Sequence, residues 1–223
     1  VYKGMDIGTA KIKSEDMKGI EHSLIDIRKP DEYFSTMDFF NIAVEIINEC
    51  HEKNRPAFVV GGTGLYFKAL FQGMFEGPGR DIDLRNKLEK KFEQDNVKLY
   101  NELKRVDPDY AEKIHFNDMK RVVRALEVYY ISGKPISKIP NRKPDFDFLK
   151  IGIMPDRKTL YDRINKRCEE MVNFGLVEET KKLISEYGED HVAFKAIGYS
   201  HAVRLLNREY DNNEFLRLFK RDT

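Results

Sequence analysis

Residues 56–72 read PAFVVGGTGLYFKALFQ, and this stretch decides the fold. Apolar, largely β-favouring residues at 57–60 precede three glycines within positions 61–64, and an apolar pattern of helical period begins at Leu65. The pattern predicts a buried strand, a glycine turn and a helix. Glycines allow close approach of a ligand and a helix start offers unpaired N–H groups, so the turn suits an anion.

Thr63 is the hydroxyl residue of this turn, and two roles are open to it. It could cap the helix that follows or bind a ligand, and its position alone favours capping. On spacing alone the motif is weak, because a glycine-rich turn also occurs where a helix packs tightly on a sheet.

Composition sets the broad class of the protein. The chain has 223 residues, 41% hydrophobic and 12% aromatic, which suffices for one large or two small domains. No apolar run is long enough to span a bilayer and the start resembles no signal peptide, so we expect a soluble, cytoplasmic protein without membrane contact. Cys50 and Cys168 lack a CxxC partner, which argues against a disulfide framework and a zinc site.

The charge balance does not by itself indicate a polyanionic partner. The 39 basic and 38 acidic residues give a net charge of +1, so local clusters must carry that argument. The best cluster is Lys120-Arg121-Val122-Val123-Arg124, in which two valines split the basic residues.

The segment before the glycine turn has the order of a parallel α/β unit. Residues 22–27 alternate as a strand would, and Ser35 or Thr36 caps a helix with apolar residues at helical spacing. The strand predicted at 57–60 follows at once. Strand, helix and strand in this order indicate a right-handed crossover.

The segment after the turn changes character. Glycines and a proline at 73–79 resemble a hinge, and the sequence from Asp81 to about Ser132 is charged and helical in pattern. Asp107 and Asp118 stand at two predicted helix starts. We predict three segments, namely an α/β core at 1–77, a helical insertion at 78–147 and the rest of the α/β core at 148–223.

The last segment opens with a predicted strand at 148–153. A long helix follows at about 157–174, with Arg163, Lys166 and Arg167 on one side. Further helices are predicted at about 176–187 and after residue 199.

Five motifs together resemble one family, the bacterial-type tRNA dimethylallyltransferases. In chain order they are GMDIGTAK at 4–11, HSLID at 22–26, GGTGLY at 61–66, RVVRALE at 121–127 and AIGY at 196–199. The resemblance spans nearly the whole chain, and five motifs in order are more specific than any one of them.

The resemblance implies a reaction and an architecture. A dimethylallyl group passes from dimethylallyl diphosphate to N6 of the adenine on the 3′ side of a tRNA anticodon, with release of diphosphate and assistance from Mg²⁺. Charge builds on the leaving diphosphate and a proton leaves the amine, so cations and a carboxylate are required. The implied fold is a P-loop NTPase-like parallel-sheet core with a helical insertion over the anticodon stem-loop, and we expect a monomer.

The resemblance also assigns residues. Arg167 matches an arginine beside the diphosphate and is the expected catalytic residue, with a simple cationic helix face as the alternative. Gly61 and Gly62 match a substrate channel, and no metal ligand is assigned. The expected tRNA contacts are Thr63, Arg85, Lys120, Arg121, Val122, Val123, Arg124, Lys195, Ala196, Ile197, Gly198, Tyr199 and Ser200. Of these, Val122 and Val123 are expected to pack in the core rather than to contact tRNA. Ser200 stands where the family commonly has a basic residue, so a phosphate contact is less expected there.

The chain departs from the family pattern in one respect. It contains no G-x-x-x-x-G-K-[ST] sequence, so the P-loop and the general-base aspartate that the resemblance implies are expected upstream of Val1. Three alternatives stay open, namely a prenyltransferase of free adenine nucleotides, a non-catalytic RNA-binding module and a nucleotide kinase. The helical insertion with its basic cluster at 120–124 argues against the first alternative, because binding a small nucleotide requires no such insertion.

Overall fold

The computed structural model describes residues 1–223, which divide into two units. The terminal unit consists of Val1–Asp38, Glu45–Asn54 and Leu149–Thr223, and the middle unit of Phe39–Val44 and Arg55–Phe148. Each unit has its own apolar core.

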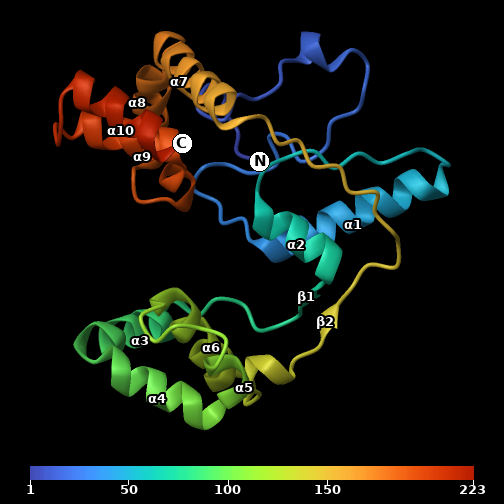
Figure 1. Cartoon of the computed structure of the whole chain (residues 1–223), viewed down its shortest axis with the longest axis vertical. Coiled ribbons are helices and arrows are strands. Elements are labelled where there is room, and N and C mark those ends of the chain that lie inside the picture. The colour runs from blue at the N-terminus through green and yellow to red at the C-terminus, as the bar shows by residue number, and fades with distance from the viewer. The chain divides into compact units, whose positions relative to one another are not determined.

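Helices form most of the middle unit. They are α3 (Ile82–Gln94), α4 (Asn96–Val106), the short α5 (Pro108–Ala111) and α6 (Met119–Ser132), which gather in one group in Figure 1. An aspartate side chain caps the start of each one, as predicted at Asp107 and Asp118. Their facing sides bury a core that includes Leu88, Leu103 and Leu126.

A small sheet joins the two ends of this helical group. Strand β1 (Met74–Phe75) pairs antiparallel with β2 (Asn141–Arg142), and Met74 lies opposite Arg142. Gly73, at φ +77°, precedes β1, and a Cβ placed there would lie 2.6 Å from the Arg142 carbonyl oxygen. Glycine is therefore required by both the backbone angle and the close approach.

The same unit contains α2 (Gly64–Gln72) and the part Phe39–Val44 of α1 (Thr36–Glu52). Phe39 of α1 stacks on Tyr66 of α2, with the ring centroids 4.1 Å apart. The predicted cap of α1 is confirmed as a capping box, in which Ser35 and Asp38 each bond to the other's backbone N–H.

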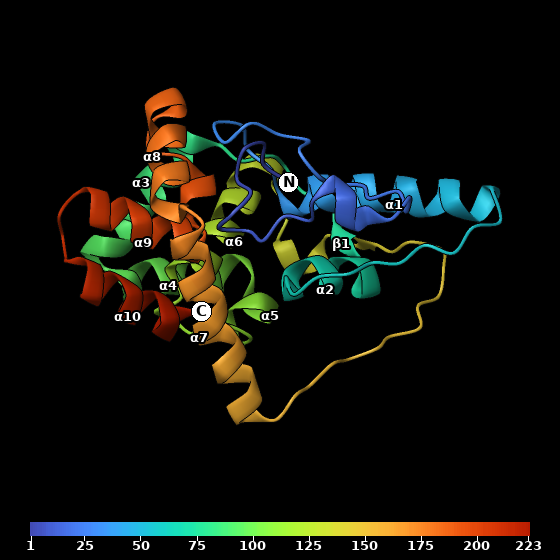
Figure 2. The same cartoon turned by 90° about the horizontal axis from the view of Figure 1, so that it is seen from above.

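The terminal unit is also helical. Its helices α7 (Arg157–Asn173), α8 (Leu176–Tyr187), α9 (Ile197–Leu206) and α10 (Asn212–Asp222) are labelled in Figure 2, and 3₁₀ turns lie at Ser14–Met17 and Val192–Lys195. A further 3₁₀ turn, Ile136–Lys138, belongs to the middle unit. The core of the terminal unit joins Met5, near the N-terminus, to Cys168, Leu176 and Phe215.

The predicted strands are the main difference between sequence and structure. Residues 22–27, 57–60 and 148–153 form no strand, and the only parallel pairing is an isolated bridge between Tyr2 and Arg28. Phe58 and Val60 are 85% and 92% exposed, so the segment predicted as a buried strand is an exposed, extended chain. A parallel strand needs neighbours for its backbone groups and a cover on both faces. Segment 57–60 is exposed, and segment 22–27 has a backbone bond only at its end, from Ile27 to the Val1 carbonyl.

No helix of the structure combines the length and the apolar composition that crossing a membrane requires.

Candidate functional site

The glycine turn lies open at the surface of the middle unit. Gly61, Gly62 and Thr63 are exposed, and a Cβ placed at Gly62 would meet no other atom. Thr63 is the residue before α2, but its side chain makes no capping hydrogen bond, so the capping predicted for its hydroxyl is not found. The hydroxyl and the first N–H groups of α2 are therefore free to meet a ligand.

Helix α6 presents its basic residues in two ways. Lys120 and Arg121 are exposed, and Arg121 has one ion pair, at 3.4 Å from Asp118. Val122 and Val123, which precede Arg124 in the sequence, are fully buried in the core. The two valine side chains pack and do not face solvent, in line with the packing role that the sequence favours for them.

The structure brings together two predicted site residues, Arg85 of α3 and Arg124 of α6. Both donate to the same carboxylate oxygen of Glu127, at 2.6 and 2.7 Å. The other oxygen of Glu127 accepts the backbone N–H of Asp81 at 3.0 Å, and Arg124 also donates to the carbonyl of Pro78 at 2.9 Å. We call Arg85, Arg124 and Glu127 the arginine–glutamate cluster.

The carboxylate at the centre of this cluster is ionised despite complete burial. Burial by itself raises the pKa of Glu127, because a charge loses its hydration. The hydrogen bonds from Arg85, Arg124 and the Asp81 N–H outweigh that effect and lower the pKa below its ordinary value. The cluster therefore has two positive charges and one negative charge at neutral pH.

Arg167 lies on α7 in the terminal unit. It is exposed, and neither it nor Arg163, one helical turn away, takes part in an ion pair within the structure. Its neighbour Lys166 lies 3.8 Å from Glu170. A guanidinium without an internal partner keeps all its donors for an anionic ligand.

The predicted site segment 195–200 divides between surface and core. Lys195, Ala196 and Ile197 are exposed, whereas Gly198 and Tyr199 are buried. Ser200 donates through its hydroxyl to the carbonyl of Ile197 at 2.9 Å.

Tyr199, itself buried, contacts a partly buried carboxylate in the terminal unit. Its hydroxyl donates to Glu179 of α8 at 2.5 Å. The same carboxylate accepts backbone N–H groups of the N-terminal loop, from Asp6, Ile7 and Gly8. Burial and the neighbouring Glu179 raise the pKa of Tyr199, so it stays a hydrogen-bond donor.

Gly8 is needed for this arrangement. A Cβ placed at Gly8 would lie 2.5 Å from a ring carbon of Tyr199 and 2.8 Å from Leu176. The GMDIGTAK and AIGY motifs, far apart in the sequence, are thus parts of one packed contact. Next to it, Lys11 binds the carboxylates of Asp6 and Asp26.

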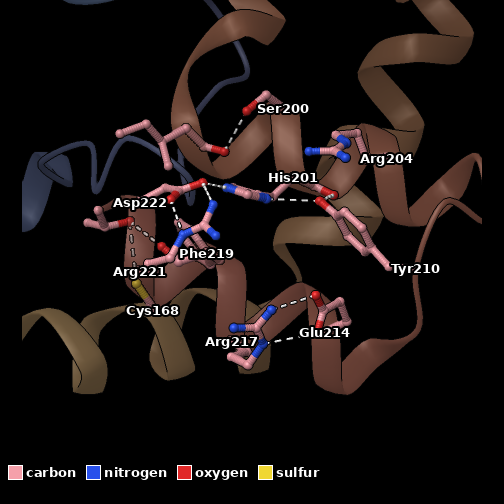
Figure 3. A network of polar contacts seen from close by, with 12 residues as sticks. Cys168, Ser200, His201, Arg204, Tyr210, Glu214, Arg217, Phe219, Arg221 and Asp222 are labelled. Atoms are coloured by element: carbon pink, nitrogen blue, oxygen red, sulfur yellow. Dashed lines mark hydrogen bonds and ion pairs between the residues drawn. The ribbon is translucent and has the colours of Figure 1, made fainter.

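A polar network at the C-terminal helices is shown in Figure 3. His201 of α9 lies 3.2 Å from a carboxylate oxygen of Asp222 in α10, and its other ring nitrogen lies 2.8 Å from the hydroxyl of Tyr210. Burial lowers the pKa of His201 more than Asp222 raises it, so the ring is neutral at pH 7. Of the residues predicted from the sequence as site residues, Ser200 lies beside this network, where it bonds the carbonyl of Ile197. The contacts of His201 with Asp222 and Tyr210 tie α9 to α10 and its preceding loop.

Sequence reasoning missed Glu127 and Glu179. Glu127 had a signal, because it is a lone carboxylate within the apolar stretch from Val122 to Val128. Glu179 had none, because it stands in a mixed, charged helix and the loop N–H groups that it accepts lie more than 170 positions away.

The side chains of this structure include no group of three or more His, Cys, Asp or Glu residues that could hold a metal ion. They do not form a protein cage for a divalent cation. Mg²⁺ in proteins often keeps several waters and binds through one or two carboxylates together with substrate phosphates.

Comparison with known proteins gives one consistent result. The model of the family described as IPP transferase matches residues 1–223. The tRNA dimethylallyltransferase of Halothermothrix orenii is 41% identical over 230 residues, which cover all of this chain and 70% of that protein. The tRNA dimethylallyltransferase of Acetivibrio thermocellus is 44% identical and is covered to 74%.

Solved structures agree with the sequence comparisons. The full-length tRNA isopentenylpyrophosphate transferase of Bacillus halodurans superposes with a TM-score of 0.64 at 39% identity, covering all of this chain and 71% of that one. A eukaryotic dimethylallyltransferase acting on tRNA gives a TM-score of 0.78 at 25% identity, covering 99% of this chain and 57% of that one.

Proposed function

The chain belongs to the IPP transferase family, and we propose on that basis that it modifies tRNA by transferring a dimethylallyl group from dimethylallyl diphosphate. The observation that carries this proposal is the match over all 223 residues, together with relatives at about 40% identity that have this activity in their names. The acceptor within the tRNA is proposed, from the motif resemblance, to be N6 of the adenine on the 3′ side of the anticodon.

The reaction sets the requirements for the site. The bond between the allylic carbon and the diphosphate oxygen breaks, a bond from that carbon to N6 forms, and a proton leaves the amine for a general base. Negative charge grows on the departing diphosphate, so a cation placed beside it lowers the barrier. The acceptor amine lies on a base edge, which favours a flipped nucleotide.

Arg167 is proposed to supply that cation. Its exposure and its lack of an internal ion pair support this role, since a guanidinium already paired to a carboxylate would have fewer donors to offer. Arginine can hold a phosphate group through two parallel hydrogen bonds, which fixes the leaving group as its charge rises.

The middle unit is proposed to contact the tRNA. Lys120 and Arg121 are exposed on α6, and Arg124 follows one turn later, where it meets Arg85 through Glu127. Basic side chains on one helix face suit the phosphates of an RNA stem and give a binding strength that falls with salt. Thr63 and the segment 195–200 are proposed as further contacts.

Two finer proposals concern the metal and the fold. Mg²⁺ is proposed to bind together with the diphosphate, because the side chains form no three-ligand group that would hold it alone. A P-loop NTPase-like parallel-sheet core is proposed from the motif resemblance.

A transfer assay tests the function. The full-length protein is incubated with labelled dimethylallyl diphosphate and either tRNA or AMP, and we expect label on tRNA alone. Label on AMP and none on tRNA would instead identify a prenyltransferase of free nucleotides. No label on either acceptor, with tRNA bound, would identify an RNA-binding module.

Arg167→Ala assigns the catalytic cation in the same assay. We expect kcat to fall by about 10²–10³-fold while the Kd for tRNA stays unchanged, because the lost contact acts on the leaving group. Lys166→Ala, on the same helix and with the same charge change, is the control and should have little effect. Equal losses of turnover and tRNA binding in Arg167→Ala would make it an RNA contact or a structural residue.

A further inference from the structure

The arginine–glutamate cluster has a feature that stability alone does not explain. Glu127 is a fully buried acid on α6, in the midst of the apolar core of the middle unit. Taking a carboxylate and two guanidinium groups out of water costs free energy that their attraction often does no more than offset. A well-packed apolar residue at this position would serve the core as well.

The cluster fixes geometry in two places. Through Arg85 and Arg124 it joins the cationic groups of α3 and α6 at one carboxylate oxygen. Through the Asp81 N–H and the Pro78 carbonyl it also fastens the segment 78–81, which runs from β1 into α3. Arg124 further stacks on Phe75 of β1, with its guanidinium carbon 5.9 Å from the ring centroid.

The two arginines keep capacity for a ligand. Their side chains are 20% and 29% exposed, whereas Glu127 is completely buried, so the positive ends reach the surface and the negative charge does not. Arg85 donates only to Glu127, and its Nε is buried without a partner. The buried Nε–H cannot reach a ligand, but the terminal N–H donors of Arg85 that Glu127 does not use are unpaired within the chain.

The neighbouring surface adds to the positive charge. Lys120 and Arg121 lie one turn before Arg124 on α6 and are exposed. The acidic residues next to these four basic residues are Glu127, Asp118, which caps α6, and Asp81, which caps α3. The face has an excess of positive charge, and Glu127 holds two of its four cations in place.

We propose that Glu127 is a positioning residue for tRNA binding, which holds Arg85 and Arg124 as a fixed pair directed to the RNA backbone. This inference rests on the proposed function, because it takes tRNA as the ligand of the middle unit. A fixed pair loses less side-chain entropy on binding than two independent arginines do, and it meets the phosphates in one geometry.

Glu127→Gln separates positioning from simple electrostatics. The substitution keeps the shape of the side chain and removes its negative charge, so the face becomes more positive. If charge alone mattered, tRNA would bind more tightly. Positioning predicts the reverse, with Kd and KM for tRNA raised by about tenfold and kcat at saturating tRNA unchanged. Equal or tighter binding by the folded variant would overturn the proposal.

Two further variants control this measurement. Glu112→Gln makes the same charge change at an exposed position of the middle unit and should leave the KM for tRNA unchanged. In an Arg85→Met background, Glu127→Gln should weaken binding much less than it does in the wild type, because one of the two groups it positions is gone. Full additivity of the two changes would show that Glu127 does not act through Arg85 and would contradict the proposal.

Arg124→Lys tests the proposal without altering the buried carboxylate, and it decides the matter if Glu127→Gln does not fold. Lysine keeps the charge but cannot donate to both Glu127 and the Pro78 carbonyl in a fixed plane. We expect weaker tRNA binding at unchanged charge, and unchanged binding would refute the inference. A wild-type protein that does not bind tRNA would instead refute the proposed function.

Discussion

Amphipathic helix α6 and the apolar segment 57–60 both contain adjacent valines, yet the environments of these valines are opposite. Val122, Val123 and Leu126 of α6 are completely buried, whereas Phe58 and Val60 are almost fully exposed. A helix satisfies its own backbone hydrogen bonds and needs only a partner for its apolar face. A strand needs neighbours for its backbone as well, so 57–60 stays in solvent although it is more apolar than α6.

Leu126→Ala gives the largest effect that this comparison predicts. Leu126 is fully buried among α3, α4 and α6, and its truncation should leave a cavity that costs about 2–5 kcal/mol of the free energy of unfolding. Urea denaturation followed by circular dichroism measures this loss. A change below about 1 kcal/mol would mean that the core of the middle unit can collapse around the missing side chain.

Tyr199→Phe tests how much a polar contact contributes to the stability of the terminal unit, in comparison with apolar packing in the middle unit. It removes the hydroxyl that donates to Glu179 and should cost about 1.5–3 kcal/mol, because the acceptor is charged and partly buried. Tyr161→Phe is the control, since its hydroxyl bonds an exposed arginine at the surface. Similar unfolding free energies for the two variants would show that Glu179 is satisfied by the loop N–H groups alone.

The two units should also respond differently to pH. The folded pKa of His201 lies below its ordinary 6.5, so the stability that its neutral form gives the terminal unit is lost as pH falls from about 6.5 through that lower pKa. Glu127 has a folded pKa below its ordinary 4.5, so its contribution to the middle unit persists until the pH falls below about 4.5. Hydrogen exchange of amides in α9 and α6, measured from pH 7 to pH 4, distinguishes the two ranges.

His201→Gln and Glu127→Gln provide the controls for this pH series. The first should flatten the loss of protection in α9 below pH 6.5, and the second the loss of protection in α6 below pH 4.5. Simultaneous loss of protection in both helices at one pH would show that the units unfold together and that neither group sets the transition.

Val60→Ala has the smallest predicted effect. Its side chain is exposed in the 223-residue chain, so the free energy of unfolding should change by less than about 0.5 kcal/mol. The measurement is made on the same 223-residue chain as for Leu126→Ala. A loss of 1 kcal/mol or more would mean that the segment 57–60 is covered in solution, and the contrast with α6 would then disappear.

The sequence by itself determined the helices, their starts and the family. The caps at Ser35, Asp118 and Asp156 are readable because each bonds a backbone N–H only three residues away. The five motifs predict the family from the sequence alone, and the whole-chain match confirms it. Local hydrogen bonding and motif order need no knowledge of the tertiary structure.

Only the tertiary structure decided which residues of the candidate site meet. Arg85 and Glu127 are 42 positions apart, and Glu179 binds the loop at 6–8 across more than 170 positions. The strand predicted at 57–60 was wrong for this structure for the same reason, since strand pairing depends on distant partners. Contacts between residues far apart in the chain depend on how the elements pack, and no local pattern of residues encodes that packing.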